Sequence, residues 1–257
     1  MHLEEFAEGK SLIHSLDPRI KLLGLFPFIV VVAIAKGLTP PLIALMVGVN
    51  LVLFSRLNLK AVSSRLLTVN LFILFLWFIL PFSVKGEGIF TVGPLTATSE
   101  GISYALSITL KANAIVLSTV ALIGTIPIFR LVHALRHLRV PEKLVNLFFF
   151  CYRYISVLHE DYSALYNAMK VRAFKPTTNV RTYRSYAYLI GMLVIRSYEH
   201  SQKIYQAMLC RGFKGRFPLL DHFTGLTRKD LIFFIFMIFV AGGLLTVEMG
   251  NYFWGVP

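Results

Sequence analysis

The hydrophobic residues of this chain are gathered into long runs that are separated by short polar segments. A helix that spans a bilayer needs about 20 apolar residues, with a range of about 17 to 25. The first two runs are short, so these spans would depend on flanking Lys and Arg side chains that reach the membrane interface. Five runs predict five transmembrane helices, at residues 22–35, 40–54, 66–82, 102–126 and 231–247.

Two further apolar stretches, residues 144–158 and 187–195, are not expected to cross the membrane. The second has only nine residues, which is too few to cross a hydrocarbon core of about 30 Å as a helix. The first contains Arg153 and is predicted to lie as a helix against the inner face of the membrane. A sixth span at residues 144–158 is an alternative, but it would place the strongly basic segment that follows outside the cell.

The basic residues are distributed asymmetrically around the predicted spans. Segments 1–21, 55–65 and 127–229 hold 23 of the 26 Lys and Arg residues. Because positive charge accumulates on the cytoplasmic side of membrane proteins, the N-terminus is predicted to be cytoplasmic. The chain would then comprise four transmembrane helices in residues 1–126, a cytoplasmic helical module in residues 127–229, and a last transmembrane helix with an outer tail in residues 230–257. The expected location is the cytoplasmic (inner) membrane of a prokaryote.

The composition supports a lipid bilayer as the main solvent. Hydrophobic residues make up 56% of the chain and charged residues 15%, whereas soluble domains contain about 25% charged residues. The mean hydropathy is +0.68, and the fold class expected is an all-α integral membrane protein. The net charge of +13 mostly reflects topology and suits an acidic partner on the cytoplasmic face. Nucleic acid is a poor partner, because the basic residues are scattered along helices flanked by membrane spans.

Asp17 and Pro18 have the pattern of a helix start, an N-cap followed by proline at the first helical position. Residues 33–35 (Ala-Ile-Ala) have a cleavage-like pattern, but the segment before the first run carries four acidic residues where a signal peptide is positive. A retained first span is therefore expected. The glycine-rich segment 83–101 is predicted to form a turn or a short hairpin.

The sequence contains no motif for common catalytic chemistry. It has no Walker A sequence, no Gly-rich dinucleotide fingerprint, no His-Glu-x-x-His and no Gly-x-Ser-x-Gly. We expect no catalytic residue, no bound metal and no cofactor on this chain. His133 and His137 could face one metal from a helix, but no Cys or carboxylate accompanies them at ligand spacing.

Lys111 and Asn113 are polar residues near the middle of the fourth predicted span. Such residues are costly in a membrane and commonly face a protein partner or a polar cavity. One interpretation is a contact with another membrane subunit; the other is that Lys111 lies nearer the interface and snorkels. A membrane-embedded enzyme would need more convergent polar residues within its spans than the sequence provides.

A sequence repeat in the predicted cytoplasmic segment is the clearest functional signal. Seven residues recur in constant register thirty-nine positions later, Glu160, Tyr166, Ala168, Met169, Arg172, Phe174 and Lys175 as Glu199, Tyr205, Ala207, Met208, Arg211, Phe213 and Lys214. On a helix, Leu165, Ala168, Met169 and Arg172 share one face, as do their counterparts Ile204, Ala207, Met208 and Arg211. Each copy thus predicts a helix with a narrow apolar stripe that ends in an arginine.

The simplest explanation is that each cationic residue compensates the helix dipole, worth about 0.3 to 1 kcal/mol. Gly212 fits a C-cap, and Pro176 follows the first copy. Dipole compensation does not require the same Ala, Met and Phe in both copies. The duplication instead suits docking into two equivalent grooves, such as those of a pair of soluble subunits, with arginine recognising carboxylates or helix-end carbonyls.

At these residues the chain resembles the transmembrane T component of energy-coupling factor (ECF) transporters, the EcfT/CbiQ family. The resemblance rests on Arg211-Gly212, which matches the Ala-Arg-Gly-like motif of that family, and on Arg172-Ala173, which departs from it by replacing glycine with alanine. It extends to residues 13–21, 135–141 and 152–154.

The resemblance implies two cytoplasmic helices that dock in two ATP-binding-cassette ATPases and a membrane S component that binds the substrate. ATP and Mg would be held by the ATPases, not by this chain. The implied ATPase-coupling residues are Ala168, Met169, Arg172, Ala173, Ala207, Met208, Arg211 and Gly212. Residues 196–199 and 205–213 look most like the T components for cobalt or nickel uptake; a vitamin-importing T component is the alternative.

Overall fold

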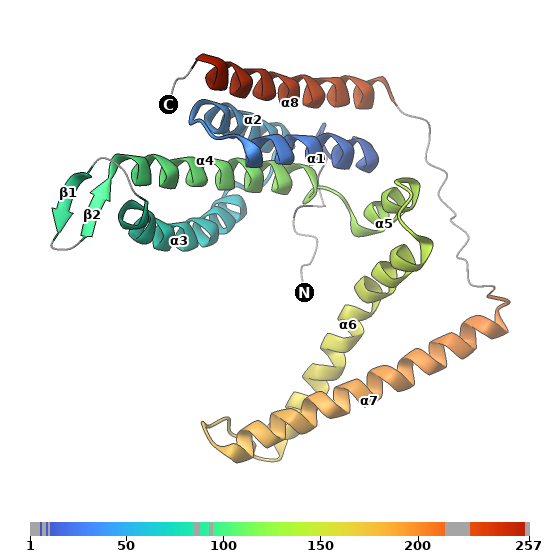
Figure 1. Cartoon of the computed structure of the whole chain (residues 1–257). Helices are drawn as coiled ribbons and strands as arrows, with labels where there is room; N and C mark the ends of the chain where they lie inside the picture. Colours follow the sequence, from blue (N-terminus) through green and yellow to red (C-terminus); the bar gives the residue numbers. More distant parts are fainter. Residues whose placement is uncertain are drawn as a thin grey trace. The chain divides into compact units, whose positions relative to one another are not determined.

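A computed structural model describes residues 6, 9, 11–84, 88–92, 95–213 and 227–254 (Figure 1). These ranges fold almost entirely into helices, which confirms the expected all-α class. In chain order the elements are α1 (Pro18–Ile34), α2 (Thr39–Ser55), α3 (Leu59–Ser83), β1 (Gly88–Val92), β2 (Leu95–Thr98), α4 (Ser99–Leu122), α5 (Ile128–His137), α6 (Glu142–Val171), α7 (Val180–Cys210) and α8 (Arg228–Trp254).

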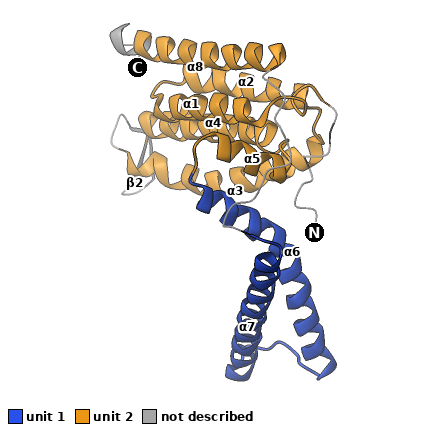
Figure 2. Ribbon diagram, turned by 90° about the vertical axis from the view of Figure 1, so that its right-hand side faces the viewer, with its two compact units in different colours: residues 1, 141–225 blue, residues 2–140, 226–257 orange. Residues whose placement is uncertain are grey.

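The chain divides into two compact units (Figure 2). The membrane unit consists of residues 2–140 and 226–257, and residues 141–225 form the paired-helix unit, which contains α6 and α7. The short helix α5 packs with the membrane unit, against α1. The sidedness of residues 1–126, 127–229 and 230–257 stays a prediction, because packing does not report on which side of a bilayer a segment lies.

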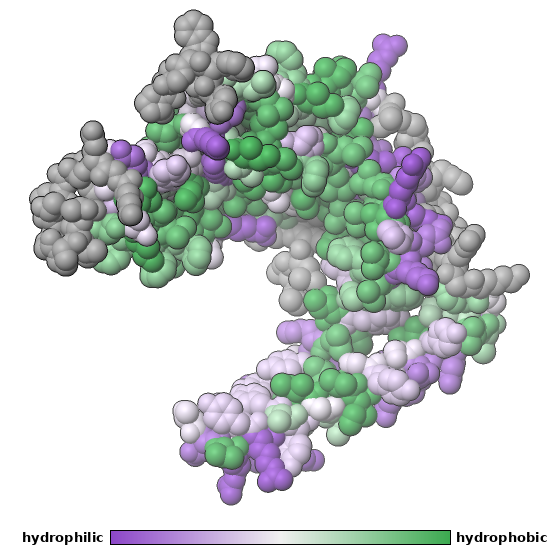
Figure 3. Space-filling model, in the orientation of Figure 1, coloured by the Kyte–Doolittle hydropathy of each residue, from purple (hydrophilic) through white to green (hydrophobic). Residues whose placement is uncertain are grey.

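The five apolar runs of the sequence correspond to α1, α2, α3, α4 and α8. Three of them, α3, α4 and α8, are long and apolar enough to cross a membrane by length and composition. Helices α1 and α2 have 17 residues each, about 26 Å at 1.5 Å per residue. Apolar side chains cover much of the membrane unit in Figure 3, as expected for a surface that faces lipid.

The predicted hairpin in segment 83–101 is present. Strands β1 and β2 pair antiparallel, with Thr91 opposite Thr96. Thr98 then begins α4 as its N-cap, because its side chain accepts a hydrogen bond from the N–H of Gly101 at 3.2 Å. The hairpin therefore leads directly into the fourth transmembrane helix.

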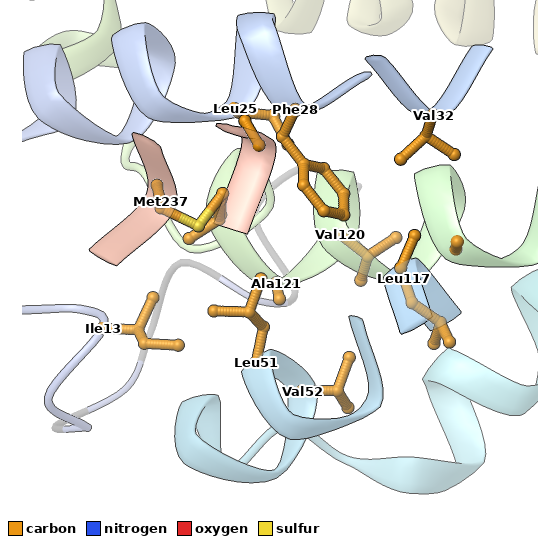
Figure 4. Close-up of a cluster of buried hydrophobic side chains, with 14 of the residues drawn as sticks. Ile13, Leu25, Phe28, Val32, Leu51, Val52, Leu117, Val120, Ala121 and Met237 are labelled. Atoms are coloured by element: carbon orange, nitrogen blue, oxygen red, sulfur yellow. The ribbon is translucent and has the colours of Figure 1, made fainter. Parts of the chain in front are cut away.

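The core of the membrane unit lies where α1, α2, α4 and α8 meet. Phe28 of α1, Leu117 of α4 and Met237 of α8 are buried together, with Leu51 of α2 beside them (Figure 4). Gly48 allows α2 to approach α4 closely. A Cβ at this position would lie 3.2 Å from the carbonyl oxygen of Ala114, from Leu117 Cβ and from Ser118 Oγ. The α2–α4 contact is thus set by the absence of a side chain.

Substitution of Gly48 by leucine is expected to destabilise the membrane unit. Overpacking of a close helix contact costs about 1 to 3 kcal/mol, so the midpoint of thermal unfolding of the detergent-solubilised protein should fall. Gly242→Leu on α8 is the matched control, because no atom lies within 4 Å of an added Cβ there. Equal midpoints for the two variants would contradict the assignment of Gly48 to a tight helix contact.

Candidate functional site

The repeat forms the C-terminal parts of two long helices, α6 and α7, with 30 and 31 residues. The sequence suggested separate apolar stretches at 144–158 and 187–195 followed by repeat helices. The structure joins each stretch and its repeat copy into one continuous helix. The charged residues that interrupt the apolar runs, such as Arg153, do not end either helix.

Both helices end in the same backbone arrangement. At the end of α6, the N–H of Phe174 donates to the carbonyl of Met169 at 3.1 Å and that of Ala173 to Lys170 at 3.0 Å. At the end of α7, Phe213 donates to Met208 at 3.1 Å and Gly212 to Leu209 at 2.9 Å. These pairs of bonds define the Schellman motif, in which the residue after the cap is left-handed.

Ala173 adopts this left-handed conformation with φ +60°, close to the φ +77° of Gly212. The replacement of glycine by alanine therefore leaves the cap geometry unchanged. A non-glycine residue in this region costs about 1 to 2 kcal/mol, and the two hydrogen bonds of the cap offset part of this cost. Arg172 and Arg211 consequently occupy the same cap position at the ends of their helices.

Helices α6 and α7 run antiparallel and contact each other in their middle parts. Near one end, the rings of Phe174 and Tyr186 meet at 5.6 Å between centroids. At the crossing, Asp161 lies 3.8 Å from the guanidinium of Arg196 and 3.5 Å from Nε2 of His200. Asp161 and His200 are equivalent positions of the 39-residue repeat. When equivalent residues of two copies contact each other, the two copies are related by a two-fold axis. The relation between the two repeat copies here is approximate.

Two grooves flank this crossing, one on each side. The first, of about 650 Å³, is lined by Leu165 and Met169 of α6 together with Leu189 of α7. The second, of about 390 Å³, is lined by Ile204 and Met208 of α7 together with residues of α6 that include Phe150, the repeat equivalent of Leu189. The equivalent apolar residues of each copy thus face the other helix.

The stripe predicted from the sequence is therefore divided between two environments. Leu165, Met169, Ile204 and Met208 are half-buried in the grooves between the helices, whereas Ala168, Ala207, Arg172 and Arg211 are exposed, as are Ala173 and Gly212. Sequence periodicity had placed stripe and arginine on a single docking face. The structure leaves the alanine and the arginine of each copy as the accessible part.

The first groove lies at a strongly basic end of the paired-helix unit. Between Asp161 and Glu199 the sequence has no acidic residue and six basic ones, Lys170, Arg172, Lys175, Arg181, Arg184 and Arg196. Three of these, Arg172, Lys175 and Arg181, line the groove. The first turn of α7 also lacks an acidic residue, so its positive helix end adds to the same potential. This end favours an acidic partner.

Lys111 and Asn113 lie in the membrane unit and make contacts within it. The side-chain amides of Asn113 and Asn70 exchange two hydrogen bonds of 3.0 and 3.1 Å, which join α4 to α3. Lys111 Nζ donates to the carbonyl of Ala33 at 3.4 Å. Asn70 was missed by sequence reasoning, although its amide within an apolar run signalled a need for a partner. Contact of Lys111 and Asn113 with another membrane subunit stays a prediction.

His133 and His137 lie one turn apart on α5, with their ring centroids 6.1 Å apart. Partial burial, together with the positive charge of Arg19, lowers the pKa of His137 below its ordinary value. Within the described ranges, no group of three or more His, Cys, Asp or Glu residues is arranged to hold a metal ion.

Comparison with known protein families identifies the kind of protein to which these helices belong. Residues 9–220 match the family CbiQ, described as cobalt transport protein. The chain belongs to this family. Both repeat copies as far as Lys214 lie within the matched range. The resemblance drawn from the arginine motifs is thereby confirmed, and the chain is a non-catalytic transmembrane subunit of an ECF transporter.

Relatives from bacteria and archaea share this assignment. The energy-coupling factor transporter transmembrane protein EcfT of Thermosediminibacter oceani is 25% identical over 97% of this chain and 97% of its own length. The protein of the same name from Bacillus subtilis is 25% identical over 84% of this chain and 85% of its own. A putative fused cobalt transport protein CbiMQ of Methanocorpusculum labreanum is 34% identical over 49% of this chain and 21% of its length.

Charge reversal at both CbiQ-type helix ends tests their docking role. We expect Arg172→Glu with Arg211→Glu to abolish copurification of the ATPase subunits, because truncating one hot-spot residue already costs about 2 kcal/mol or more. The membrane unit should remain folded, so elution from size exclusion in detergent should not change.

Lys143→Glu with Lys203→Glu is the matched control, since it changes the charge of α6 and α7 equally at exposed positions before the caps. Wild-type ATPase recovery from the arginine double variant would exclude these residues as docking groups. The same loss in both double variants would show that net charge, not the caps, holds the ATPases.

Proposed function

We propose that this energy-coupling T component serves an importer for cobalt or nickel ions. The observation that carries the proposal is the match of residues 9–220 to a family described by cobalt transport. The similarity to a fused cobalt transport protein supports it further. The ion is a substrate of the assembled transporter and would be selected by the S component, so this chain needs no tight metal site of its own.

The paired-helix unit supports a coupling mechanism with two ATPases. Arg172 and Arg211 each lie eleven residues beyond the crossing residues Asp161 and His200, about 16 Å along each helix at 1.5 Å per residue. Because the helices are antiparallel, the two arginines project from opposite ends of the pair. Each exposed end would dock in one ATPase, and closure of the ATPases on ATP would move both ends of the pair.

A vitamin-importing T component is the second candidate. It is favoured by the EcfT relatives, which align over most of this chain, whereas the cobalt-named relative covers about half of it. The two candidates share the coupling mechanism and differ in the S component that binds the chain.

Purification of the intact complex through an affinity tag on this chain would decide between them. We expect a copurified membrane subunit that carries cobalt or nickel, detected by elemental analysis, and ATP-dependent cobalt uptake by cells that express the whole complex. The Arg172→Glu, Arg211→Glu variant should lose uptake and serves as the control for background transport. A bound vitamin, identified by mass spectrometry, with no uptake of either metal would establish the second candidate instead.

Topology can be tested by thiol labelling in a variant in which the exposed Cys151 and Cys210 are replaced by serine. A cysteine at Gly93, which lies outside the described residues between β1 and β2, should react with a membrane-impermeant reagent in intact cells. A cysteine at Lys175 should react only after lysis. The opposite pattern would place the N-terminus and the paired-helix unit outside the cell.

A further inference from the structure

The segment that contains α5 and the paired-helix unit departs from the end of α4, and the chain continues in the membrane unit with α8. Thr125, just after α4, marks the point of departure, and Asp230, in the first turn of α8, marks the return. Both residues contact the start of α1, Thr125 through Lys21 and Asp230 through Asp17. Three helix ends that are distant in the sequence are thus joined by polar contacts.

The contact at the point of departure is fully buried. Lys21 Nζ donates a hydrogen bond to Thr125 Oγ1 at 3.1 Å, and the side chains of Lys21 and Thr125 are 1% and 0% exposed. The Thr125 hydroxyl in turn donates to the last turn of α4, where the carbonyl of Ala121 lies at 2.9 Å. Lys21 therefore connects α1 to the end of α4.

The contact at the point of return is made by a buried carboxylate. Asp230, 4% exposed, accepts hydrogen bonds of 2.9 Å from the N–H groups of Asp17 and of Thr227. Asp17 in turn caps α1, because its side chain accepts from the N–H of Arg19 at 2.9 Å. A single carboxylate thus holds the first turn of α8 against the N-cap of α1.

Burial of these charged groups is energetically unfavourable if their only role is to stabilise the fold. A buried charge costs several kcal/mol of desolvation, and well-packed apolar residues often replace buried ionic groups without loss of stability. The Lys21 ammonium interacts electrostatically with the carboxylates of Asp17 and Asp230 and with the guanidinium of Arg130. The charges and directional bonds fix the relative positions of three helix ends, which apolar packing specifies less sharply.

We propose that Asp17, Lys21, Thr125 and Asp230 form a joint that transmits motion of the paired-helix unit into α1. The segment that leads to that unit departs from α4 at Thr125 and passes through α5, which also packs against α1, and the chain re-enters the membrane unit next to Asp230. A force that arrives through either connection acts on the start of α1 instead of bending the chain at residues 125 or 227. The proposal assigns a role to the motif in residues 13–21, and it rests on the energy-coupling role of the chain but not on the identity of the transported ion.

The joint is tested by a pair of substitutions at Thr125 in the complete complex, reconstituted in proteoliposomes. Thr125→Val keeps the shape of the side chain but removes the oxygen that Lys21 contacts, whereas Thr125→Ser keeps this oxygen. We expect Thr125→Val to assemble with the ATPases and hydrolyse ATP, and to lower cobalt uptake per ATP at least several-fold. Thr125→Ser should keep the wild-type ratio.

Ser118→Ala is the control for loss of a buried hydroxyl, since this α4 residue is 0% exposed and its Oγ has no hydrogen-bond partner among the described residues. An independent variant, Asp230→Asn, loses the carboxylate charge at the point of return and should also lower the ratio. An unchanged ratio in Thr125→Val, or an equal decrease in Ser118→Ala, would overturn the proposal. Failure of both Thr125→Val and Asp230→Asn to assemble would do the same, because it would assign the cluster to stability alone.

A second measurement does not depend on the transported substrate. Spin labels at Leu23 of α1 and Leu67 of α3, which are 46% and 69% exposed, would report on the membrane unit in a background without Cys151 and Cys210. We expect their distance to change when the complex traps nucleotide, and this change to vanish in Thr125→Val but persist in Thr125→Ser. A wild-type complex without cobalt uptake would refute the metal substrate; a change that survives in Thr125→Val would refute the joint.

Discussion

Hydrocarbon offers no hydrogen bonds to the polar groups of the membrane unit, and this constraint organises the rest of the structure. The backbone of each span is therefore helical, and polar side chains within the spans can join neighbouring helices by hydrogen bonds. The Asn70–Asn113 amide pair joins α3 to α4. Trp77 Nε1 adds a 2.9 Å bond to Thr109 on the same pair of helices. Helix α3, which buries little of its surface, is thus positioned by directed contacts as well as by apolar packing.

The paired-helix unit differs from the membrane unit in how its side chains are buried. Its helices bury few residues completely, Val145 in α6 and Thr182 and Leu189 in α7. Its apolar residues are half-buried in two grooves, and its basic residues are exposed. Such a surface is incomplete without partners, which agrees with the partnership of ECF T components with ATPases and S components. The large apolar core and the two exposed basic helix ends of the chain therefore lie in separate units.

Much of the architecture could be predicted from the sequence because it depends on two patterns that can be recognised along the chain without knowledge of tertiary contacts. Apolar runs gave the membrane helices, and the constant 39-residue register gave the two equivalent helix ends. The continuity of α6 through Arg153 could not be predicted from hydropathy, because an arginine interrupts an apolar run in the sequence although an exposed arginine does not interrupt a helix. The partners Asn70 and Asn113 are 43 residues apart, and their pairing depends on how α3 and α4 pack.

The repeat also shows where helical periodicity fails as a guide. Leu165 and Met169 share a helix face with Ala168 and Arg172, but periodicity does not reveal that the partner for half of this face is the other copy. That knowledge requires the antiparallel crossing. In the same way, the sequence alone suggests that alanine at position 173 disrupts the motif, because glycine is expected there. The backbone of Ala173 nevertheless has the same cap conformation as Gly212 in the second copy.

The approximate two-fold relation at Asp161 and His200 makes the paired-helix unit symmetric about the crossing of α6 and α7, with one arm of each helix beyond the crossing. Each arginine lies the same number of residues from the crossing, so the two arms have equal length. A change in the crossing angle displaces both arginines by equal amounts while the crossing itself stays in place. Two ATPases that close symmetrically would therefore load the arms evenly. A subunit with unequal arms would convert the same closure into sideways translation of the whole pair.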